Sequence, residues 1–223
     1  MNDIINWVRI TGVIDMERLH FDKHDILRFC RARKFELQKV KTMITNFATW
    51  YEEEKIHDLL ETWTFPEDRA IKAALPYGMH KYDKQGRPVF IRRVGVVDFD
   101  AFFKASTPER VIRHITWQNE EYKYLIYPTM SRLMGKHIES NAQIFDLTEG
   151  NLRKLASRQC LNLIKLGAQV GQDYYPETMG AVHIVNAPML FSALYAIIKG
   201  FLDERTRSKV RIIGSNYKPY LLE

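Results

Sequence analysis

The sequence predicts an α/β fold with a largely parallel sheet. Three short apolar runs, residues 142–147, 181–185 and 210–213, have the length and composition of buried strands. Helical patterns over about 152–170 and 190–201 separate them. The order strand, helix, strand, helix, strand favours parallel pairing through crossover helices.

The part of the chain before this sheet has helical patterns. Asp25 is placed to cap a first helix, and a second is predicted over residues 37–54. The second helix repeats apolar residues at three- and four-residue spacing, at Val40, Met43, Ile44, Phe47 and Trp50. Pro66 is placed to begin a further helix. We therefore predict a helical region over 1–62 and a second domain over 63–223.

A hairpin and a long helix are predicted in the first part of the second domain, before its three apolar strands. Residues 79–82 and 89–92 are extended runs joined by a polar turn that contains glycine. Thr107 and Pro108 open a helix that continues to about residue 133. Pro128 lies inside this helix and is expected to bend or interrupt it.

Composition indicates a globular protein and excludes several functional classes. Of the 223 residues, 46% are hydrophobic and 27% are charged, which argues against a disordered chain. The net charge of +6 fits nucleic acid, an anionic membrane or plain solubility, but the clusters of basic and aromatic residues typical of nucleic-acid binding are missing from the sequence. Cys30 and Cys160 form no CxxC pair, so we expect no metal or redox site. We also expect no signal peptide, no membrane-spanning helix and a cytoplasmic location.

Residues 189–201 form an unusually apolar helical pattern. The large side chains share one face, and they are Leu190, Phe191, Leu194, Ile197, Ile198 and Phe201. A crossover helix buried against the sheet explains this pattern. A lid over an apolar cavity, able to touch a membrane, would show the same pattern, so the pattern alone does not decide between them.

Five short motifs carry a family resemblance. In order they are LRFCRARKF at 27–35, HKYDKQGRPV at 80–89, YYPETMG at 174–180, IVNAP at 184–188, and FLD at 201–203 leading to Ser208 and Lys209. With them the chain resembles the CRAL-TRIO domain family from about residue 25 to 222. The resemblance is specifically to the fungal-type phosphatidylinositol/phosphatidylcholine transfer proteins.

This resemblance implies a mixed, mostly parallel sheet that floors an apolar pocket, with a helical gate over residues 189–202. It also implies a carrier that extracts one phospholipid, phosphatidylinositol, and transfers it or presents it to a lipid kinase. The expected ligand is that phospholipid, with no cofactor and no metal. The expected partners are this lipid, a lipid kinase and the surface of Golgi or other membranes. The protein is expected to be a monomer that contacts the membrane only transiently.

A phosphoinositol headgroup needs cations for its phosphate and carboxylates or hydroxyls for its ring. The family positions that supply them correspond here to Arg33, Lys34, Asp83, Glu177, Thr206 and Lys209. Ordinary structural roles explain the same residues. Arg33 and Glu177 would form an ion pair, Asp83 would stabilise a turn, and Lys209 would be a solvated helix end.

The family positions for phosphatidylcholine depart from the pattern. They correspond to Met79, Asn141, Gln143 and Tyr175, of which only Tyr175 is retained. Amides can still donate to a phosphate, but Met79 offers no aromatic face to choline. We therefore expect weak phosphatidylcholine exchange and a second lipid of another kind.

Two acyl chains need an apolar pocket, because each buried CH₂ contributes about 0.8 kcal/mol. The candidate residues for its walls and gate are Phe90, Ile144, Phe145, Ile184, Phe191, Leu194, Ile198 and Phe201. An ordinary hydrophobic core would use the same residue types.

Two other classes of function fit parts of the sequence. An enzyme could use His80, Asp83 and Asp146, but they come without a GxSxG elbow, a P-loop or metal-spaced ligands, so we expect no catalytic residues. A lipid-sensing adaptor, or a carrier of a neutral ligand such as tocopherol, retinal or a sterol, is the alternative within the same fold. The charged residues Arg33, Glu177 and Lys209 favour a phosphoinositol over a neutral ligand.

Overall fold

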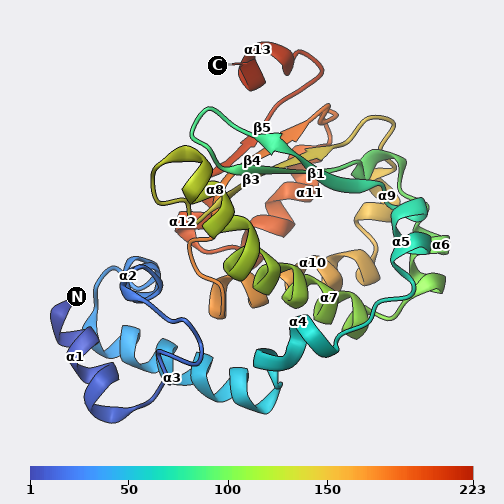
Figure 1. Cartoon of the computed structure of the whole chain (residues 1–223). Coiled ribbons are helices and arrows are strands. Elements are labelled where there is room, and N and C mark those ends of the chain that lie inside the picture. The colour runs from blue at the N-terminus through green and yellow to red at the C-terminus, as the bar shows by residue number, and fades with distance from the viewer. Residues whose placement is uncertain (223) are drawn as a thin grey trace.

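The computed structural model describes residues 1–222, in which helices surround one five-stranded sheet (Figure 1). The strands, in the order β1-β2-β3-β4-β5, are Tyr77–Tyr82, Pro88–Arg92, Asn141–Asp146, Met179–Val185 and Val210–Ile212. β1 pairs with β2 in antiparallel fashion, and β2 to β5 are parallel. The predicted mixed, mostly parallel sheet is therefore confirmed.

The helices form an N-terminal region and the layers around the sheet. The N-terminal region contains α1 (Asn2–Thr11), α2 (Lys23–Ala32), α3 (Leu37–Glu53), a 3₁₀ turn (Ile56–Asp58) and α4 (Leu59–Thr62). The remaining helices are α5 (Asp68–Ala74), α6 (Phe99–Ala105), α7 (Pro108–Glu121), α8 (Tyr127–Met134), α9 (Leu152–Leu155), α10 (Arg158–Asp173), α11 (Phe191–Ile198), α12 (Glu204–Ser208) and α13 (Lys218–Leu222). Helices α7 and α10 pack together below the sheet in Figure 1, with α1–α3 to their lower left.

The N-terminal region has a hydrophobic core of its own. Val8, Ile26 and Ile44 are fully buried and belong to a cluster drawn from α1, α2, α3 and the turns that follow. Trp50 of this region stacks on Tyr174 with ring centroids 3.8 Å apart, which joins it to the α/β domain. The boundary at 62/63 stays a prediction.

Helix α2 begins one turn earlier than the sequence suggested. Asp22 is the N-cap residue, and its carboxylate accepts hydrogen bonds from the backbone N–H groups of His24 and Asp25. The Asp25 carboxylate accepts the N–H of Asp22 in return, at 2.8 Å. Asp25 is thus the third residue of a capping box rather than the cap, because either carboxylate suits a helix start.

Two predicted helices are interrupted. The helix opened by Thr107 contains a π-helical segment, Tyr122–Ile126, just before Pro128. This extra residue in the turn accommodates the missing N–H of proline, so the predicted interruption is confirmed. The helix predicted over 152–170 is two helices, because the Ser157 side chain accepts the N–H of Cys160 and caps α10 separately.

We predict that Glu67→Gln removes stability that the native protein loses in acid. Arg110 donates to both carboxylate oxygens of Glu67 and Ser106 donates at 3.0 Å, and the bonds from Arg110 lower the Glu67 pKa from 4.5 to about 2. This contribution is present above pH 4.5, the ordinary value, and is lost as the pH falls from there toward about 2.

Urea unfolding between neutral pH and about pH 3 measures this effect. The variant should lose less stability than the native protein over that range. Asp100→Asn is the control, because the Asp100 side chain is 88% exposed. Equal pH dependence in the native protein and Glu67→Gln would contradict the prediction.

Candidate functional site

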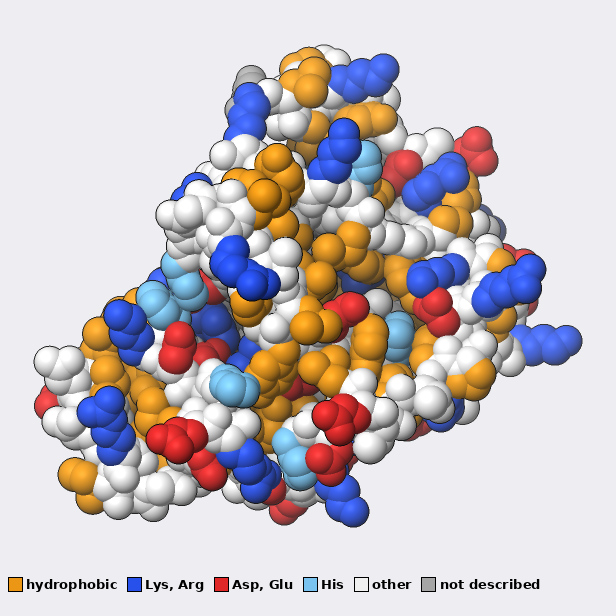
Figure 2. Space-filling view, in the orientation of Figure 1, with side chains coloured by type: hydrophobic (Ala, Val, Ile, Leu, Met, Phe, Trp, Pro, Cys, Tyr) orange, Lys and Arg blue, Asp and Glu red, His pale blue; other side chains and the backbone are white. Residues whose placement is uncertain are grey.

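A cavity of about 450 Å³ lies between the sheet and helices α7, α10 and α11. Its floor includes Phe90, Phe145 and Ile184 from three neighbouring strands, and α7 contributes Val111 and Ile115. Figure 2 shows hydrophobic side chains gathered in the middle of this face, with Lys and Arg side chains around them. The volume lies within the range of roughly 300–1,000 Å³ that small-molecule sites occupy.

Helix α10 leaves room for this cavity because the residues it presents there are small. Gly167, Ala168 and Gly171 all line the cavity. A Cβ atom added at Gly171 would meet nothing within 4 Å, and one at Gly167 would only touch neighbours at 3.9 Å. Each glycine costs a helix about 1 kcal/mol relative to alanine, so the open volume is built at some expense in helix stability.

Helix α11 covers another side of the cavity. Phe191 and Leu194 are buried, and with Ile198 they line the cavity. Met189 and Leu190, at the start of this segment, are 92% and 75% exposed. The apolar residues of this segment are therefore divided between the cavity and the solvent, rather than all facing the sheet.

Charged residues meet at one end of the cavity. Glu177 accepts hydrogen bonds from Arg205, at 2.6 and 3.0 Å, and from Lys209 at 3.0 Å. Burial would raise the pKa of Glu177, but the bonds from Arg205 and Lys209 outweigh it and lower the pKa. Thr206 lies in the same group, and its hydroxyl donates to Asp203, the cap of α12, at 3.0 Å.

Arg33 and Lys34 lie beside this charged end without lining the cavity. Arg33 is 4.0 Å from a carboxylate oxygen of Asp173, in a separate hollow of about 380 Å³. Lys34 bonds to Glu204, the residue before Arg205, at 2.9 Å. Both Lys34 and Glu177 have positive φ, 51° and 63°, a conformation that non-glycine residues adopt at a cost.

Asp83 stabilises the β1–β2 turn. Its carboxylate accepts the backbone N–H groups of Gln85 and Arg87, both at 2.9 Å, and the Arg87 Nε at 2.7 Å. These bonds use most of its acceptor capacity, and Asp83 does not line the cavity. The turn role that the sequence allowed for Asp83 is present in the structure.

Three of the four positions predicted for a second lipid line the cavity, and the fourth does not. Asn141, Gln143 and Tyr175 line the cavity, whereas Met79 is 47% exposed and its sulfur accepts the hydroxyl of Tyr122. Gln143 donates to Asn141 at 3.2 Å. Asn141 donates in turn to the Tyr127 hydroxyl at 3.1 Å.

The Tyr175 hydroxyl points to a buried acid that sequence reasoning missed. Tyr175 donates to Glu120 at 2.6 Å, and Tyr51 donates to the other oxygen of Glu120 at 2.7 Å. Glu120 is 1% exposed, and burial raises its pKa. Nothing in the sequence signals this contact, because positions 51, 120 and 175 come from separate elements.

Arg92 is a second residue that sequence reasoning missed. It is the last residue of β2 and lines the cavity, with its guanidinium 4.3 Å from the centre of the Phe90 ring. It donates to Gln143 at 2.9 Å. Burial lowers the Arg92 pKa to about 10. The signal was available, because residues two apart on a strand share a face and Phe90 was already assigned to the pocket.

Two domain matches together cover most of the chain. Residues 73–223 match the CRAL/TRIO domain, and residues 11–46 match the CRAL/TRIO N-terminal domain. The chain belongs to the CRAL/TRIO family. The resemblance inferred from the five motifs is therefore confirmed.

Named relatives of this CRAL/TRIO chain come from fungi and a plant. It is 38% identical over 207 residues to the Sec14 cytosolic factor of Schizosaccharomyces pombe, covering 93% of this chain and 71% of that protein. The SEC14 cytosolic factor of Yarrowia lipolytica is 37% identical, covering 90% and 40%. An Arabidopsis thaliana phosphatidylinositol/phosphatidylcholine transfer protein, SFH11, is 35% identical, covering 92% and 54%. The chain thus spans less than two thirds of some of these relatives.

The fold of the CRAL/TRIO chain also matches a solved structure. The crystal structure of Sfh5 superposes with a TM-score of 0.70 at 20% identity, covering 91% of this chain and 67% of that one. This likeness confirms the fold.

The structure brings together part of the predicted site of this CRAL/TRIO chain. Glu177, Thr206 and Lys209 all line the charged end of the cavity. Of the predicted wall and gate residues, Phe90, Phe145, Ile184, Phe191, Leu194 and Ile198 line the cavity. Ile144 does not, because it lies between two cavity-facing residues on β3 and successive strand side chains face opposite ways. Phe201 is outside the lining too, and its carbonyl accepts Gln172 at 2.9 Å.

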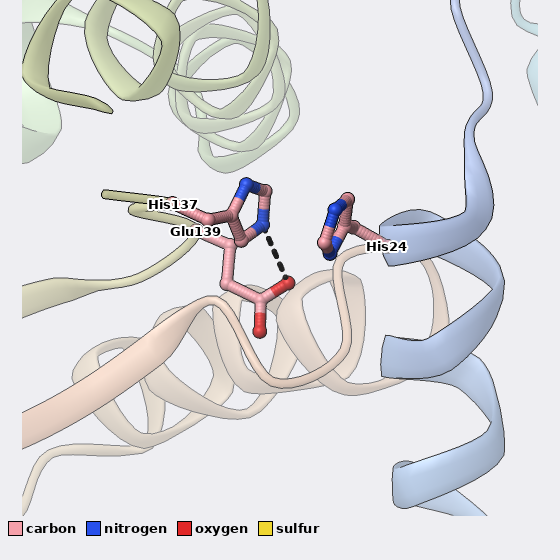
Figure 3. A group of neighbouring side chains, drawn as sticks. All are labelled: His24, His137 and Glu139. Carbon is pink, nitrogen blue, oxygen red and sulfur yellow. Dashed lines mark hydrogen bonds and ion pairs between the residues drawn. The ribbon is translucent and has the colours of Figure 1, made fainter. Parts of the chain in front are cut away.

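His24, His137 and Glu139 form a group that could be considered for a metal ion (Figure 3). Their possible ligand atoms lie within 4.8 Å of one another, and the imidazole rings stack at 3.8 Å. The Glu139 carboxylate, however, already bonds to Arg31 and lies 3.8 Å from Arg28. These two guanidinium groups would oppose a further cation, so we assign the group to contact between α2 and the segment before β3.

No helix within residues 1–222 is both long enough and apolar enough to cross a bilayer.

We predict that Glu120→Ala destabilises the protein by about 2 kcal/mol, because two buried tyrosine hydroxyls would lose their acceptor. Urea unfolding with a fluorescence readout measures the change. Glu121→Ala is the matched control, since it removes the same side chain one residue further along α7. Equal stability of the two variants would show that the buried acid does not hold Tyr51 and Tyr175 in place.

Proposed function

We propose that the protein takes a single phospholipid, phosphatidylinositol, from a membrane into its cavity and carries it to another membrane or presents it to a lipid-modifying enzyme. One observation carries the proposal, which is the apolar cavity with Glu177, Arg205 and Lys209 at its end. The apolar walls suit acyl chains, and the charged end suits a headgroup with a phosphate and hydroxyls. Relatives named for phosphatidylinositol and phosphatidylcholine transfer support this cargo.

The proposed headgroup site combines Glu177 and Lys209, which already bond to each other, with residues from neighbouring segments. Lys209 and Arg33 are proposed to neutralise the phosphate, and Lys34 adds a further cation beside them. Glu177, Thr206 and Asp83 are proposed to bond ring hydroxyls. Because Glu177 is held by two cations, a ring hydroxyl can add to a carboxylate whose orientation is already fixed.

The same observation weighs against the alternative cargo. A neutral ligand such as tocopherol, retinal or a sterol would leave Arg205 and Lys209 without an anionic partner beyond Glu177. We propose a carrier rather than an enzyme, because extraction and release need no covalent step. Its proposed setting is the cytoplasm, with transient contact at Golgi or other membranes.

Helix α11 is proposed to be the gate. Met189 and Leu190 are exposed apolar residues at its start, and Phe191 and Leu194 are buried against the cavity. Exposed apolar residues cost free energy in water, so moving the outer face of this segment into a membrane is favourable. Membrane contact would therefore favour opening at the moment of lipid exchange.

The proposed headgroup site predicts a selective loss of phosphatidylinositol transfer. Lys209→Ala and Glu177→Ala should each slow transfer of labelled phosphatidylinositol between vesicles by about tenfold, because each removes a charge-assisted bond. Arg33→Ala tests the neighbouring cation in the same way. Arg153→Ala on α9 is the control, since it removes an exposed arginine outside the cavity lining. Unchanged transfer in all three site variants would remove the headgroup assignment.

The proposed gate predicts a loss of membrane exchange without a loss of fold. Leu190→Glu should slow lipid extraction from vesicles several-fold, because it places a charge where the gate meets the membrane. Leu133→Glu is the matched control, since Leu133 is 63% exposed on α8. Thermal unfolding checks that both variants fold. Equal transfer by both variants would place membrane contact on another surface.

A further inference from the structure

Arg92 lines the cavity but has no role in the proposed headgroup site. It projects from the end of β2 into the cavity, over the ring of Phe90 at 4.3 Å and near that of Phe145 at 5.5 Å. Its Nη1 donates to the side-chain oxygen of Gln143 at 2.9 Å. A guanidinium has five N–H donors, so one bond to a neutral amide leaves most of its capacity directed at the cavity.

Arg92 differs from other arginines that are partly or fully buried in this chain. Arg28 pairs with Asp25, and Arg110 pairs with Glu67. Among the described residues, 1–222, no carboxylate lies within 4.0 Å of the Arg92 guanidinium. Moving an unpaired charge out of water is costly, so the residue is best explained by an anion that arrives with the ligand.

The neighbours of Arg92 add hydrogen-bond donors rather than negative charge. Gln143 turns its oxygen to Arg92 and its amide nitrogen to Asn141, which donates to Tyr127. Each side-chain amide has a second N–H beyond the one used in this row. The floor therefore carries a cation followed by two amides, a set that suits a phosphate or carboxylate.

The same arrangement opposes a choline group. The ring faces of Phe90 and Phe145 are the aromatic surfaces next to Gln143 on the floor of the cavity, and the guanidinium of Arg92 lies over both. A second cation placed beside it would be repelled. Arg92 thus discriminates against choline by charge, in addition to the loss of family residues at Met79, Asn141 and Gln143.

This anion site is separate from the charged end of the cavity. In the register of the sheet, Arg92 lies opposite Phe145, Phe145 opposite Ile184, and Ile184 opposite Ile212 on β5. Lys209 comes three residues before Ile212 in the sequence. Three residues and three strand spacings correspond to roughly 10 Å along the strands and roughly 14 Å across them. One headgroup phosphate cannot contact both cations at once.

We propose that Arg92, with Gln143 and Asn141, forms a second headgroup site that selects a phospholipid with net negative charge and rejects phosphatidylcholine. Phosphatidic acid, whose phosphate is a monoester without a cationic substituent, is the simplest ligand of this class. The inference rests on the proposed function, because it assumes that phospholipid enters the cavity. It adds the chemistry of the second cargo and the residue that selects it.

Vesicle transfer of labelled phosphatidic acid, phosphatidylinositol and phosphatidylcholine, measured separately, tests the proposal. The native protein should transfer phosphatidic acid at least about tenfold faster than phosphatidylcholine. Arg92→Met should reduce phosphatidic acid transfer by about tenfold and narrow or reverse the preference, while phosphatidylinositol transfer changes less than about twofold. Arg92→Lys should fall between them, because it keeps the charge but not the bidentate geometry.

Arg93→Met is the matched control, since it removes the same charge from the next, exposed position. Thermal unfolding of each lipid-free variant checks the fold, and Arg92→Met should be at least as stable as the native protein because it removes a partly buried charge that has no carboxylate beside it. Inorganic phosphate alone, titrated into the lipid-free protein, separates the two sources of anion. Phosphate binding that depends on Arg92, without preferential transfer of phosphatidic acid, would overturn the lipid assignment.

Measuring the three lipids separately also distinguishes a failure of the second headgroup site from a failure of the proposed carrier function. If phosphatidylinositol moves but phosphatidic acid transfer is no faster than that of phosphatidylcholine, or is unaffected by Arg92→Met, the second site is disproved and the carrier function stands. If none of the three lipids moves, the carrier function fails, and the inference fails with it.

Discussion

The buried carboxylate of Glu120 connects the two parts of the molecule to the charged end of the cavity. It accepts Tyr51 from α3 and Tyr175 from the segment before β4, while Glu120 itself belongs to α7. Tyr175 is two residues before Glu177, so fixing its hydroxyl also fixes the start of the segment that carries the carboxylate proposed to bind the headgroup. The stacking of Tyr174 on Trp50 supports the same junction. This support is consistent with the positive φ of Glu177, which a mobile segment would relax.

The cavity exists because residues on its walls are smaller than a packed core requires. Gly167 and Gly171 remove side chains from the inner face of α10, and the space they leave is bordered by Val111, Ile115 and Phe90. A close-packed interior would be more stable, since unfilled volume forfeits dispersion contacts. The apolar lining makes the loss recoverable, because acyl chains restore those contacts when lipid enters. Lipid binding and the stability of the α/β domain are therefore coupled.

The sequence was sufficient for the architecture and for part of the site. Apolar runs fixed the strands because buried parallel strands have few alternatives, and the order of motifs placed Glu177, Thr206 and Lys209 together. The ends of helices were harder to predict, because Asp22 and Asp25 are equally suitable as the N-cap of α2 when only the sequence is known. The Glu120 contacts were beyond reach, because three elements meet there and none signals the others. Arg92 was within reach, since its spacing from Phe90 places it on the cavity face.

The two ends of the cavity differ in their balance of charge. At one end Arg205 and Lys209 bond to Glu177, and Asp203 lies in the same group, so two cations face two carboxylates. At the floor Arg92 stands beside amides without a carboxylate. Because the walls around Arg92 are apolar, its positive charge acts in a medium that screens it weakly, and it favours a lipid that brings negative charge. A zwitterionic lipid in the cavity would have to place its cation near Arg92, where like charges repel, or leave that cation in water. An acidic lipid has no cation and avoids this repulsion. On the proposed function, Arg92 would therefore favour acidic phospholipids at the position where choline would otherwise bind.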